Sequence, residues 1–559
     1  MTVVRTIIFA AALAALFAGC SWTPPGGGSC GVEVVGVQYA ASTGGEANET
    51  VEVLVANRSG VPVRFAGASL DGTDLPRLSG EARAALRAFR FDGAASPFVH
   101  GKAAVRPVAG ARWWQFYPSE TVPAGSFAVF QLNFDGRSRP CRLVLRTEDG
   151  RELSADVPRY SEPIRKVSFL SFASGGRSVF ARLAGRGAPA EVRVNGRGVA
   201  FSSFPAPCVG GAEVVEAVPA EPVAGGAATL VEFVFADGRS RFSLVRAMLG
   251  VRLEAPFGPD GDRPLPPGVA GRYGLDDGVL VRRFPYDAVC SDVRAGAPGS
   301  MSRDVVGWRA RCLAEDPGSL CGVDLCTALY PSAWNIYSQS ADAVIVKPYR
   351  LHWSASPERF VEDEDAFVRD KVEASAPRPV EWVPERFTRS GGIAGAEFEE
   401  LAWCAIVRGA RGVRIHHWFD GSADPLASDP SLGDAVRRLC AGVRARRGVV
   451  ESLVPVRSRE VGRGLVSVVE SWSPGRGALL LVRRPRLRSE RRSPRGGPSE
   501  ETLVFDHPVP PWLGKCRAED FLTGEPVEAE VSDGVARVTL HGFDSYRLVW
   551  LAGRERSTR

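Results

Sequence analysis

AEFEELAWCAIVRGARGVRIHHWFD, residues 396–420, decides how the centre of the chain folds. Its first part, 396–410, is an apolar segment that carries acidic residues at helical spacing, and its second part continues through a Gly-Ala-Arg-Gly turn into the strand-like run GVRIHHW, 412–418. A helix followed within a few residues by an apolar strand is typical of a sheet whose strands are joined by crossover helices.

The flanking segments between 250 and 448 repeat this alternation. Strand-like runs are LGVRLEAPF (249–257), VLVRRFPYD (279–287), SLCGVDLC (319–326), ADAVIVKPYRL (341–351) and RPVEWVPERF (378–387). Helix-like runs are 302–316, 357–375 and 431–448. The pattern predicts a parallel sheet, open or closed into a TIM-like (β/α) barrel. Since an eight-stranded barrel usually takes about 250 residues, either further strands lie in 256–278 or the barrel is incomplete.

Before residue 250 the runs are short and alternate in polarity. VEVVGVQYA (32–40), ETVEVLVANRSG (49–60) and SFAVFQLNF (126–134) are separated by turn signals, which is typical of a β-sandwich. The motif DGRSR occurs at 135–139 and again at 237–241, each time between apolar runs, and Asp-Gly in such a place favours a hairpin. We therefore predict two immunoglobulin-like β-sandwiches, 30–160 and 161–249. Their simplest role is to hold the rest of the chain at a distance from a membrane.

Strands return after residue 449. The runs are 464–472, 477–484, 501–507, 534–542 and 545–551. They predict a C-terminal all-β sandwich over 449–559. The basic stretch RRPRLRSERRSPRGG (483–497) inside it has no apolar period, which favours a solvated loop, with contact to anionic lipid or polysaccharide as the alternative.

The chain begins with MTVVRTIIFAAALAALFAGC, an export signal with one basic residue and an apolar run too short to span a membrane. The tetrad Phe17 to Cys20 resembles the bacterial lipobox, which implies a signal peptide over 1–19, cleavage before Cys20, and lipidation of its thiol. Residues 20–29 then form a linker. Ser21, by its resemblance to Gram-negative sorting signals, favours the outer membrane. The alternative is a plain secretory signal with a cysteine nearby.

Composition narrows the possible functions. Apolar residues make up 45% and charged residues 24%, as in a protein that folds in water, and the net charge is only +5. Basic residues are interleaved with acids, so we expect no nucleic-acid partner. Serine-hydrolase, zinc-peptidase and nucleotide-binding motifs are absent from the sequence contexts they require.

Ten cysteines remain after Cys20, an even number that permits disulfides in an exported chain. Cys30 opens the first module and Cys141 lies near its end, so this pair is the first candidate bridge. Cys321 and Cys326 bracket four residues, but neither a histidine cluster nor a second close cysteine pair completes a zinc site, and we expect no metal and no cofactor.

Three patterns together resemble the catalytic half of bacterial clan-A-like glycoside hydrolases. Residues 396–420 are similar to their penultimate helix, turn and last barrel strand. ADAVIVKPYRL is similar to a strand that ends in Asp-Pro-Tyr in many of them, with Lys347 in place of the aspartate. Residues 518–551 resemble the C-terminal sandwich that follows such barrels. The resemblance covers about 280–552 and implies a barrel that acts on carbohydrate.

Glycoside hydrolysis uses two carboxyl groups that face each other across a cleft, and in a barrel such groups lie at the carboxyl ends of strands. The candidates are Asp287, Asp292, Asp324, Glu385 and Asp420. By the resemblance, 279–287 is the fourth strand, whose Asp287 would be the acid/base, and 378–387 is the seventh, whose Glu385 would be the nucleophile. Active members usually have a glutamate at the fourth strand, and relatives often have glutamine near the position of Glu385. Both departures favour a non-catalytic alternative.

The paired histidines lie in a strand-like run, where adjacent side chains point to opposite sides. Only one of His416 and His417 can therefore face the barrel interior, and Arg414, His416 and Trp418 share a side if the strand is regular. We expect His416 to line the cleft and Trp418, Tyr349 and Trp353 to contact sugar rings. Trp382 is a further candidate for which core packing is an equal alternative.

These observations predict a lipid-anchored protein of the cell envelope, at the outer membrane or cell surface. Its partners would be the lipid bilayer, through Cys20, and a poly- or oligosaccharide that it binds and, if it is an enzyme, hydrolyses. Two further hypotheses are a non-catalytic lipoprotein that binds carbohydrate or serves as a structural scaffold, and an adhesin that acts through its sandwich modules. The sequence leaves the sugar, the linkage and the oligomeric state open.

Overall fold

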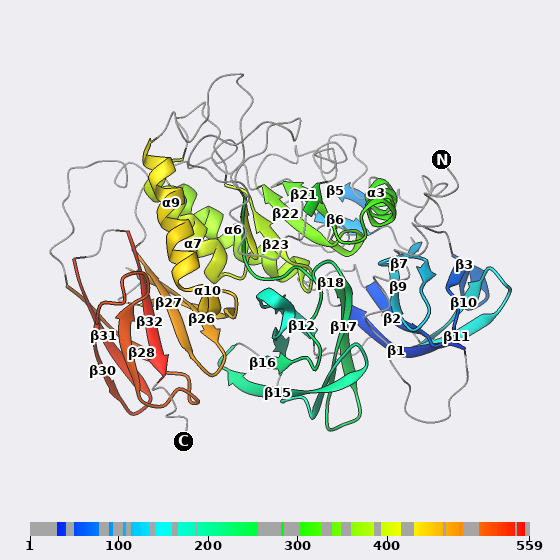
Figure 1. Ribbon diagram of the computed structural model, residues 1–559, viewed down its shortest axis with the longest axis horizontal. Coiled ribbons are helices and arrows are strands. Elements are labelled where there is room, and N and C mark those ends of the chain that lie inside the picture. Colours follow the sequence, from blue (N-terminus) through cyan, green and yellow to red (C-terminus); the bar gives the residue numbers. More distant parts are fainter. Residues whose placement is uncertain are drawn as a thin grey trace.

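The computed structural model describes residues 31–40, 50–75, 77, 89–92, 104–107, 113–133, 140–158, 166–185, 187–208, 211–254, 281–283, 302–326, 338–347, 359–384, 393–414, 430–461, 466–484, 502–542 and 545–553. Over these residues the chain is multidomain and mostly β, with antiparallel sheets on both sides of one parallel sheet (Figure 1). None of the helices in this part of the chain is long and apolar enough to cross a membrane.

The first module is built from two antiparallel sheets. One has the order β1-β2-β9-β7, and the other has the order β11-β10-β3-β4 with β8 paired to β3. Their strands are β1 (Val32–Ala40), β2 (Thr50–Asn57), β3 (Val63–Leu70), β4 (Thr73–Asp74), β7 (Trp113–Tyr117), β8 (Thr121–Val122), β9 (Phe127–Asn133), β10 (Cys141–Thr147) and β11 (Glu152–Val157). A separate pair joins β5 (Phe89–Asp92) to β6 (Ala104–Pro107).

One core fills the space between the two sheets of this module. Phe116 and Phe130 from the first sheet share it with Phe65 and Leu143 from the second, and the rings of Phe65 and Phe116 stack with centroids 4.5 Å apart. Two sheets around one core form the sandwich that the alternating pattern predicts. Residues 135–139, the first DGRSR motif, lie outside the described residues, but the strands on either side of them, β9 and β10, belong to different sheets.

The second module is one seven-stranded antiparallel sheet, β12-β13-β16-β15-β14-β17-β18. Its strands are β12 (Lys166–Phe172), β13 (Val179–Ala184), β14 (Glu191–Val194), β15 (Arg197–Ala206), β16 (Ala212–Val218), β17 (Ala228–Val234) and β18 (Ser240–Arg246), with the short helix η1 (Ser174–Gly176) after β12. The start of β15 pairs with β14 and the rest pairs with β16, so one strand joins two halves that share a core. Where a β-sandwich is expected over 161–249, the structure has one continuous strand order whose two halves share a core.

The second DGRSR motif does close a hairpin. β17 pairs with β18 up to Val234 and Ser240, and the Asp237 side chain accepts a hydrogen bond of 3.1 Å from the Arg239 amide. Gly238 occupies the turn at φ +77°, a conformation that favours glycine.

Six parallel strands form the central sheet, in the order β19-β24-β23-β22-β21-β20. They are β19 (Arg252–Glu254), β20 (Val281–Arg283), β21 (Leu320–Cys326), β22 (Ala343–Lys347), β23 (Val380–Trp382) and β24 (Gly412–Arg414). Each strand from β20 onward lies beside the next one in the chain, and the last strand, β24, pairs with the first, β19. This is the order of strands around a barrel.

A complete barrel is not shown. The described residues include no pairing between β19 and β20, and residues 255–280, which connect them, lie outside the described part. If β24 is counted as the eighth strand, β23 is the seventh and β20 the fourth, which agrees with the numbering expected from the resemblance.

Helices cover the outer side of this sheet. They are α3 (Ser302–Glu315), α6 (Phe360–Ser375), α7 (Gly395–Val407), α9 (Pro430–Ala445) and the short α10 (Arg447–Val450). α3 contacts β21, α6 contacts β22 and β23, and α7 contacts β24. α7 is buried on almost every side, which explains why its sequence is apolar with few polar positions.

The C-terminal domain is a second two-sheet sandwich. The sheet β25-β26-β27-β32-β29 faces the sheet β28-β31-β30. The strands are β25 (Val454–Val461), β26 (Val466–Ser473), β27 (Gly477–Arg483), β28 (Thr502–Pro508), β29 (Cys516–Asp520), β30 (Glu528–Ser532), β31 (Val535–His541) and β32 (Tyr546–Gly553). The C-terminal strands expected from the sequence are thus present.

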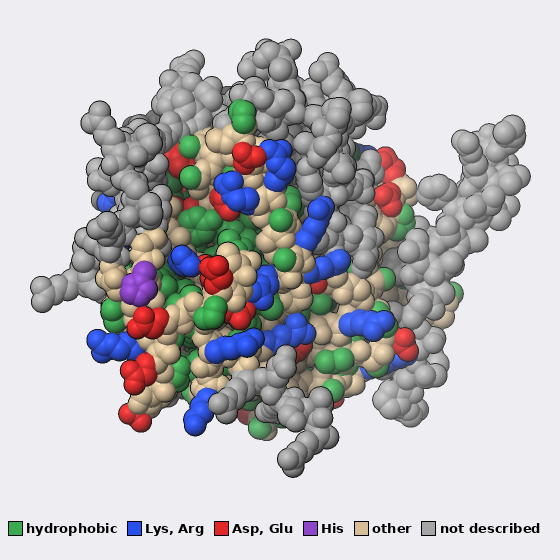
Figure 2. Space-filling view, turned by 60° about the vertical axis from the view of Figure 1, so that its left-hand side comes forward, with side chains coloured by type: hydrophobic (Ala, Val, Ile, Leu, Met, Phe, Trp, Pro, Cys, Tyr) green, Lys and Arg blue, Asp and Glu red, His purple; other side chains and the backbone are tan. Residues whose placement is uncertain are grey.

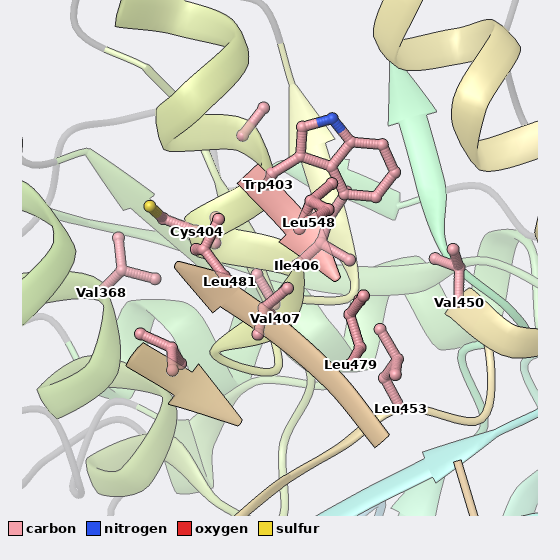
Figure 3. Close-up of a cluster of buried hydrophobic side chains, with 14 of the residues drawn as sticks. Val368, Trp403, Cys404, Ile406, Val407, Val450, Leu453, Leu479, Leu481 and Leu548 are labelled. Carbon is pink, nitrogen blue, oxygen red and sulfur yellow. The ribbon is translucent and has the colours of Figure 1, made fainter. Parts of the chain in front are cut away.

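The C-terminal sandwich packs directly on the helical layer. Figure 3 shows Ile406 and Val407 of α7 beside Leu479 and Leu481 of β27, with Leu548 of β32 in the same cluster. The second module, the central domain and the C-terminal sandwich therefore share one continuous core, whereas the first module has a core of its own.

On the side of the molecule shown in Figure 2, basic side chains lie among acidic ones, in agreement with the interleaved charges of the sequence.

Candidate functional site

The parallel sheet has an outer side that meets the helices and an inner side that does not. On β21, Val323 and Leu325 belong to the core shared with the helices. Because side chains alternate along a strand, Asp324 between them faces the inner side. Ile345 of β22 lies in a different core, with Leu320 at the start of β21, and so marks the same inner side.

A row of inner positions crosses the sheet at the level of Asp324. The register places Asp324 opposite Ile345, Ile345 opposite Glu381, and Glu381 opposite Gly412. Gly412 in turn lies opposite Arg252. Three of these five positions carry charged side chains, and all three are at least 98% buried. Charged groups in the interior of a sheet must be paired to be stable.

Glu381 is paired with two arginines. Its Oε2 accepts a hydrogen bond of 2.8 Å from Arg414 of β24, and its Oε1 lies 3.4 Å from the guanidinium of Arg252 on β19. The Glu381 and Arg252 side chains are 1% and 3% exposed, whereas that of Arg414 is 12% exposed. Arg414, at the carboxyl end of its strand, is therefore the member of this group that solvent reaches most.

Gly412 makes room for the carboxylate. A Cβ atom at Gly412 would lie 2.6 Å from Cγ of Glu381, which is closer than real Cβ contacts allow. Because Gly412 has no side chain, the Glu381 side chain can lie over β24 at this position and accept the hydrogen bond from Arg414. Strand β24 needs its glycine for this close approach rather than for a turn.

The amino ends of the strands are covered by the other domains. Asp342, directly before β22, binds Arg246 of β18 at 3.0 Å. Arg378, before β23, donates a hydrogen bond of 2.8 Å to the Leu244 carbonyl of the same strand. Arg411, before β24, donates to the Leu453 carbonyl beside the C-terminal sandwich. In Figure 1 the second module lies below the central sheet, on the side of these amino ends.

The residues predicted to act on a substrate lie outside the described part of the chain. This holds for the proposed carboxyl pair, the proposed sugar contacts and the lipidated cysteine: Asp287, Glu385, Tyr349, Trp353, His416, Trp418 and Cys20. Their roles remain predictions. The pairing of Cys30 with Cys141 is untested for the same reason, because Cys30 is not among the described residues.

Trp382 is a core residue. It is fully buried, its Nε1 donates a hydrogen bond of 2.8 Å to Glu364 of α6, and its ring stacks on Phe398 of α7 with centroids 6.3 Å apart. It faces the helices and cannot stack on a sugar. Of the two interpretations of Trp382, core packing is confirmed.

Glu381, Arg252 and Arg414 were not recognised as a group from the sequence. A signal was present: each is a charged residue inside an apolar strand-like run, at a position where alternation points it away from the helices. Only Asp324 of this inner set was among the carboxylate candidates. Over the described residues, no group of three or more His, Cys, Asp and Glu side chains is arranged to hold a metal ion.

Comparison with known proteins gives solved structures only. No protein-family model matches the chain, and no curated protein matches it. A noncanonic maltogenic alpha-amylase, AmyB, from Thermotoga neapolitana is 12% identical with a TM-score of 0.27, over 45% of this chain and 66% of that chain. An alpha-fucosidase of Thermotoga maritima is 13% identical with a TM-score of 0.22, over 45% and 68% of the two chains. Amy13B of Eubacterium rectale is 8% identical with a TM-score of 0.29, over 49% and 60%.

These structural neighbours are carbohydrate-active enzymes. The chain spans slightly less than two thirds of the amylase and three fifths of Amy13B. At such identities and TM-scores the likeness is weak, and we draw no conclusion about activity from it.

Proposed function

We propose that the chain is a lipoprotein of the cell surface, anchored through Cys20, whose central domain binds poly- or oligosaccharide at the carboxyl ends of its parallel strands. The observation that carries the proposal is the arrangement of the central sheet. Its strands follow barrel order, its amino ends are covered by neighbouring domains, and its inner side holds the Glu381 ion pairs directly below the carboxyl ends.

Hydrolysis is the enzymatic form of this proposal. Asp287 would protonate the leaving oxygen and Glu385 would attack the sugar, in line with the two-carboxylate mechanism. Glu385 comes four residues after Glu381, so regular alternation would direct both to the inner side. The same alternation would place His416 and Trp418 on the side of Arg414, where one could donate a hydrogen bond and the other could stack on a sugar ring.

A non-catalytic carbohydrate-binding protein is the second candidate, and one observation favours it. The two inner carboxylates that the structure describes are Asp324 and Glu381, and Glu381 is held by two guanidinium groups at 1% exposure. A carboxylate in this position orders the sheet interior and is not available to a substrate. Catalysis would then depend on carboxylates other than Glu381, such as Asp287 and Glu385.

A glycan array and a reducing-sugar assay on the soluble form starting at Ser21 separate the two candidates. We expect binding of at least one glycan class, and in the enzymatic case a release of reducing ends that Glu385→Gln and Asp287→Asn both abolish. Glu148→Gln, at an exposed surface pair, is the matched control and should behave as the wild type. Binding without turnover in all variants supports the scaffold, and no glycan binding contradicts the proposal.

The anchor is tested separately in cells. Labelling with a fatty-acid analogue should mark the full chain and place it in the membrane fraction, whereas Cys20→Ala should lose the label. A soluble, unlabelled wild-type chain would contradict the lipoprotein assignment without affecting the carbohydrate site.

A further inference from the structure

Two buried cysteines meet where α3 packs on β21. Cys312 lies in the last turns of α3, and Cys321 is the second residue of β21. Both are fully buried, and their thiol groups are within hydrogen-bonding contact. Cys321 alternates with Val323 and Leu325 on the side of the strand that faces the helices, so its side chain points toward α3.

The connection between the two cysteines is a short, well-bonded turn. The Asp316 amide donates a hydrogen bond of 2.8 Å to the Cys312 carbonyl, and the Ser319 amide donates one of 3.0 Å to the Asp316 carbonyl. The Gly318 amide bonds to the Asp316 side chain at 3.2 Å. On the strand side, the Cys321 amide donates a hydrogen bond of 2.8 Å to Asp342. The backbone on both sides of the contact is thus held in place by hydrogen bonds.

We propose that Cys312 and Cys321 form a disulfide when the chain folds under oxidising conditions. The two thiols lose two protons and two electrons to a disulfide oxidant, such as the disulfide of a thiol oxidoreductase or glutathione disulfide. One S–S bond forms between Cys312 and Cys321, and the oxidant leaves as two thiols. This modification goes beyond the proposed carbohydrate function and does not depend on it.

The surroundings of the pair determine when the bond forms. The hydrogen bond to Cys312, together with burial, raises the pKa of Cys321 well above its ordinary value. Because thiolates are the reacting species, the buried thiols of the folded protein react slowly, and we expect oxidation to take place during folding, before α3 closes over β21. The bridge would also hold α3, whose Arg309 donates a hydrogen bond of 2.8 Å to the Phe116 carbonyl of the first module.

Thiol counting by mass spectrometry tests the proposal. The soluble chain is refolded with oxidised and reduced glutathione, denatured, alkylated and cut on the amino side of aspartate. Asp316, Asp324 and Asp342 then place Cys312, Cys321 and Cys326 on three different peptides. We expect the peptides of Cys312 and Cys321 to appear linked, and to separate and take up one alkyl group each after reduction.

Matched controls come from two other buried cysteines. Cys404 of α7 and Cys440 of α9 should be alkylated in the same sample without prior reduction. Cys312→Ser should make Cys321 alkylatable, and reduction should lower the Tm of the wild type but not of this variant. Complete alkylation of both residues in a chain that refolded with oxidant would overturn the proposal, as would a linkage of Cys321 to Cys326.

Discussion

The Tyr117 hydroxyl donates a hydrogen bond of 2.8 Å to Asp342, and this contact joins the first β module to the residue that precedes strand β22. The same hydroxyl accepts a hydrogen bond of 3.0 Å from the Arg246 amide of the second module. The guanidinium of Arg378 lies over the Tyr117 ring, 3.5 Å from its centroid. Three parts of the chain therefore meet at one buried tyrosine, below the amino ends of the central strands.

Removing either partner should loosen this junction. We expect Tyr117→Phe to lower the free energy of unfolding by about 1–2 kcal/mol, the cost of leaving a buried acceptor without its donor. Asp342→Ala should cost about 3–5 kcal/mol, because it leaves the Arg246 guanidinium buried without its carboxylate. Urea unfolding measures both. Glu148→Ala removes an exposed partner of Arg64 and should change stability by less than about 0.5 kcal/mol; equal effects in all three variants would contradict the assigned role.

The β modules should be required for folding of the central domain. A chain that begins at residue 250 loses the partners of Asp342 and Arg378 and exposes the amino ends of the strands. We expect it to aggregate or to lack a cooperative thermal transition, whereas a chain that begins at residue 30 should fold. Circular dichroism and gel filtration distinguish these outcomes. A folded, monomeric 250–559 fragment would show that the modules are spacers after all.

Gly412 should not tolerate a side chain. The Gly412→Ala methyl group would overlap Glu381, so we expect a loss of about 1–3 kcal/mol from the strain of overpacking. Gly60→Ala, at a glycine with open space around it, is the matched control and should be neutral. Thermal unfolding gives the comparison. If Gly412→Ala left the stability unchanged, the Glu381 side chain would not lie against Gly412.

Acid should weaken the C-terminal sandwich through His507. His507 of β28 is buried, with Nε2 3.2 Å from Glu470 of β26 and Nδ1 3.1 Å from Arg459 of β25. Burial, together with the charges of Arg459 and Arg457, lowers the pKa of His507 below its ordinary 6.5, although its hydrogen bond to Glu470 and the Glu470 charge act to raise it. Burial alone would raise the pKa of Glu470, but its contacts with His507 and Arg457 outweigh this and lower it from 4.5.

The signs of both shifts agree. Below about pH 6.5 the unfolded chain binds the histidine proton more readily than the folded chain. The free energy of unfolding therefore decreases as the pH is lowered. Glu470 adds a second loss as the pH falls below about 4.5. We expect the Tm of the wild type to fall between pH 7 and 5 and His507→Gln to flatten that slope. His541→Gln, at an exposed histidine of β31, should leave the slope unchanged; a wild-type Tm that is constant over this range would contradict the prediction.

Local pattern was enough to predict many of the elements. The apolar run 396–410 predicts the helix that the structure places at Gly395–Val407, and ADAVIVKPYRL contains the strand Ala343–Lys347. Helix–strand alternation also predicts the parallel central sheet. These features depend on the periodicity of neighbouring side chains, which a sequence displays directly.

Long-range pairing could not be predicted in the same way. Two copies of DGRSR have the same local preference. The copy at 237–241 closes a hairpin, whereas β9 and β10, the strands that flank the copy at 135–139, belong to different sheets. The contact of Tyr117 with Asp342 joins residues 225 positions apart, and no local signal marks it. The roles of Asp287 and Glu385 follow only from the resemblance, and both residues lie outside the described part of the chain.

Hydrogen exchange with and without a saturating bound glycan tests most directly whether the carboxyl ends of the central strands form the binding site. We predict slower exchange in peptides that cover 347–353 and 415–420, and unchanged exchange at the amino ends, in peptides that cover 317–319 and 376–379. Protection confined to the β modules, or at the amino ends instead, would contradict this account.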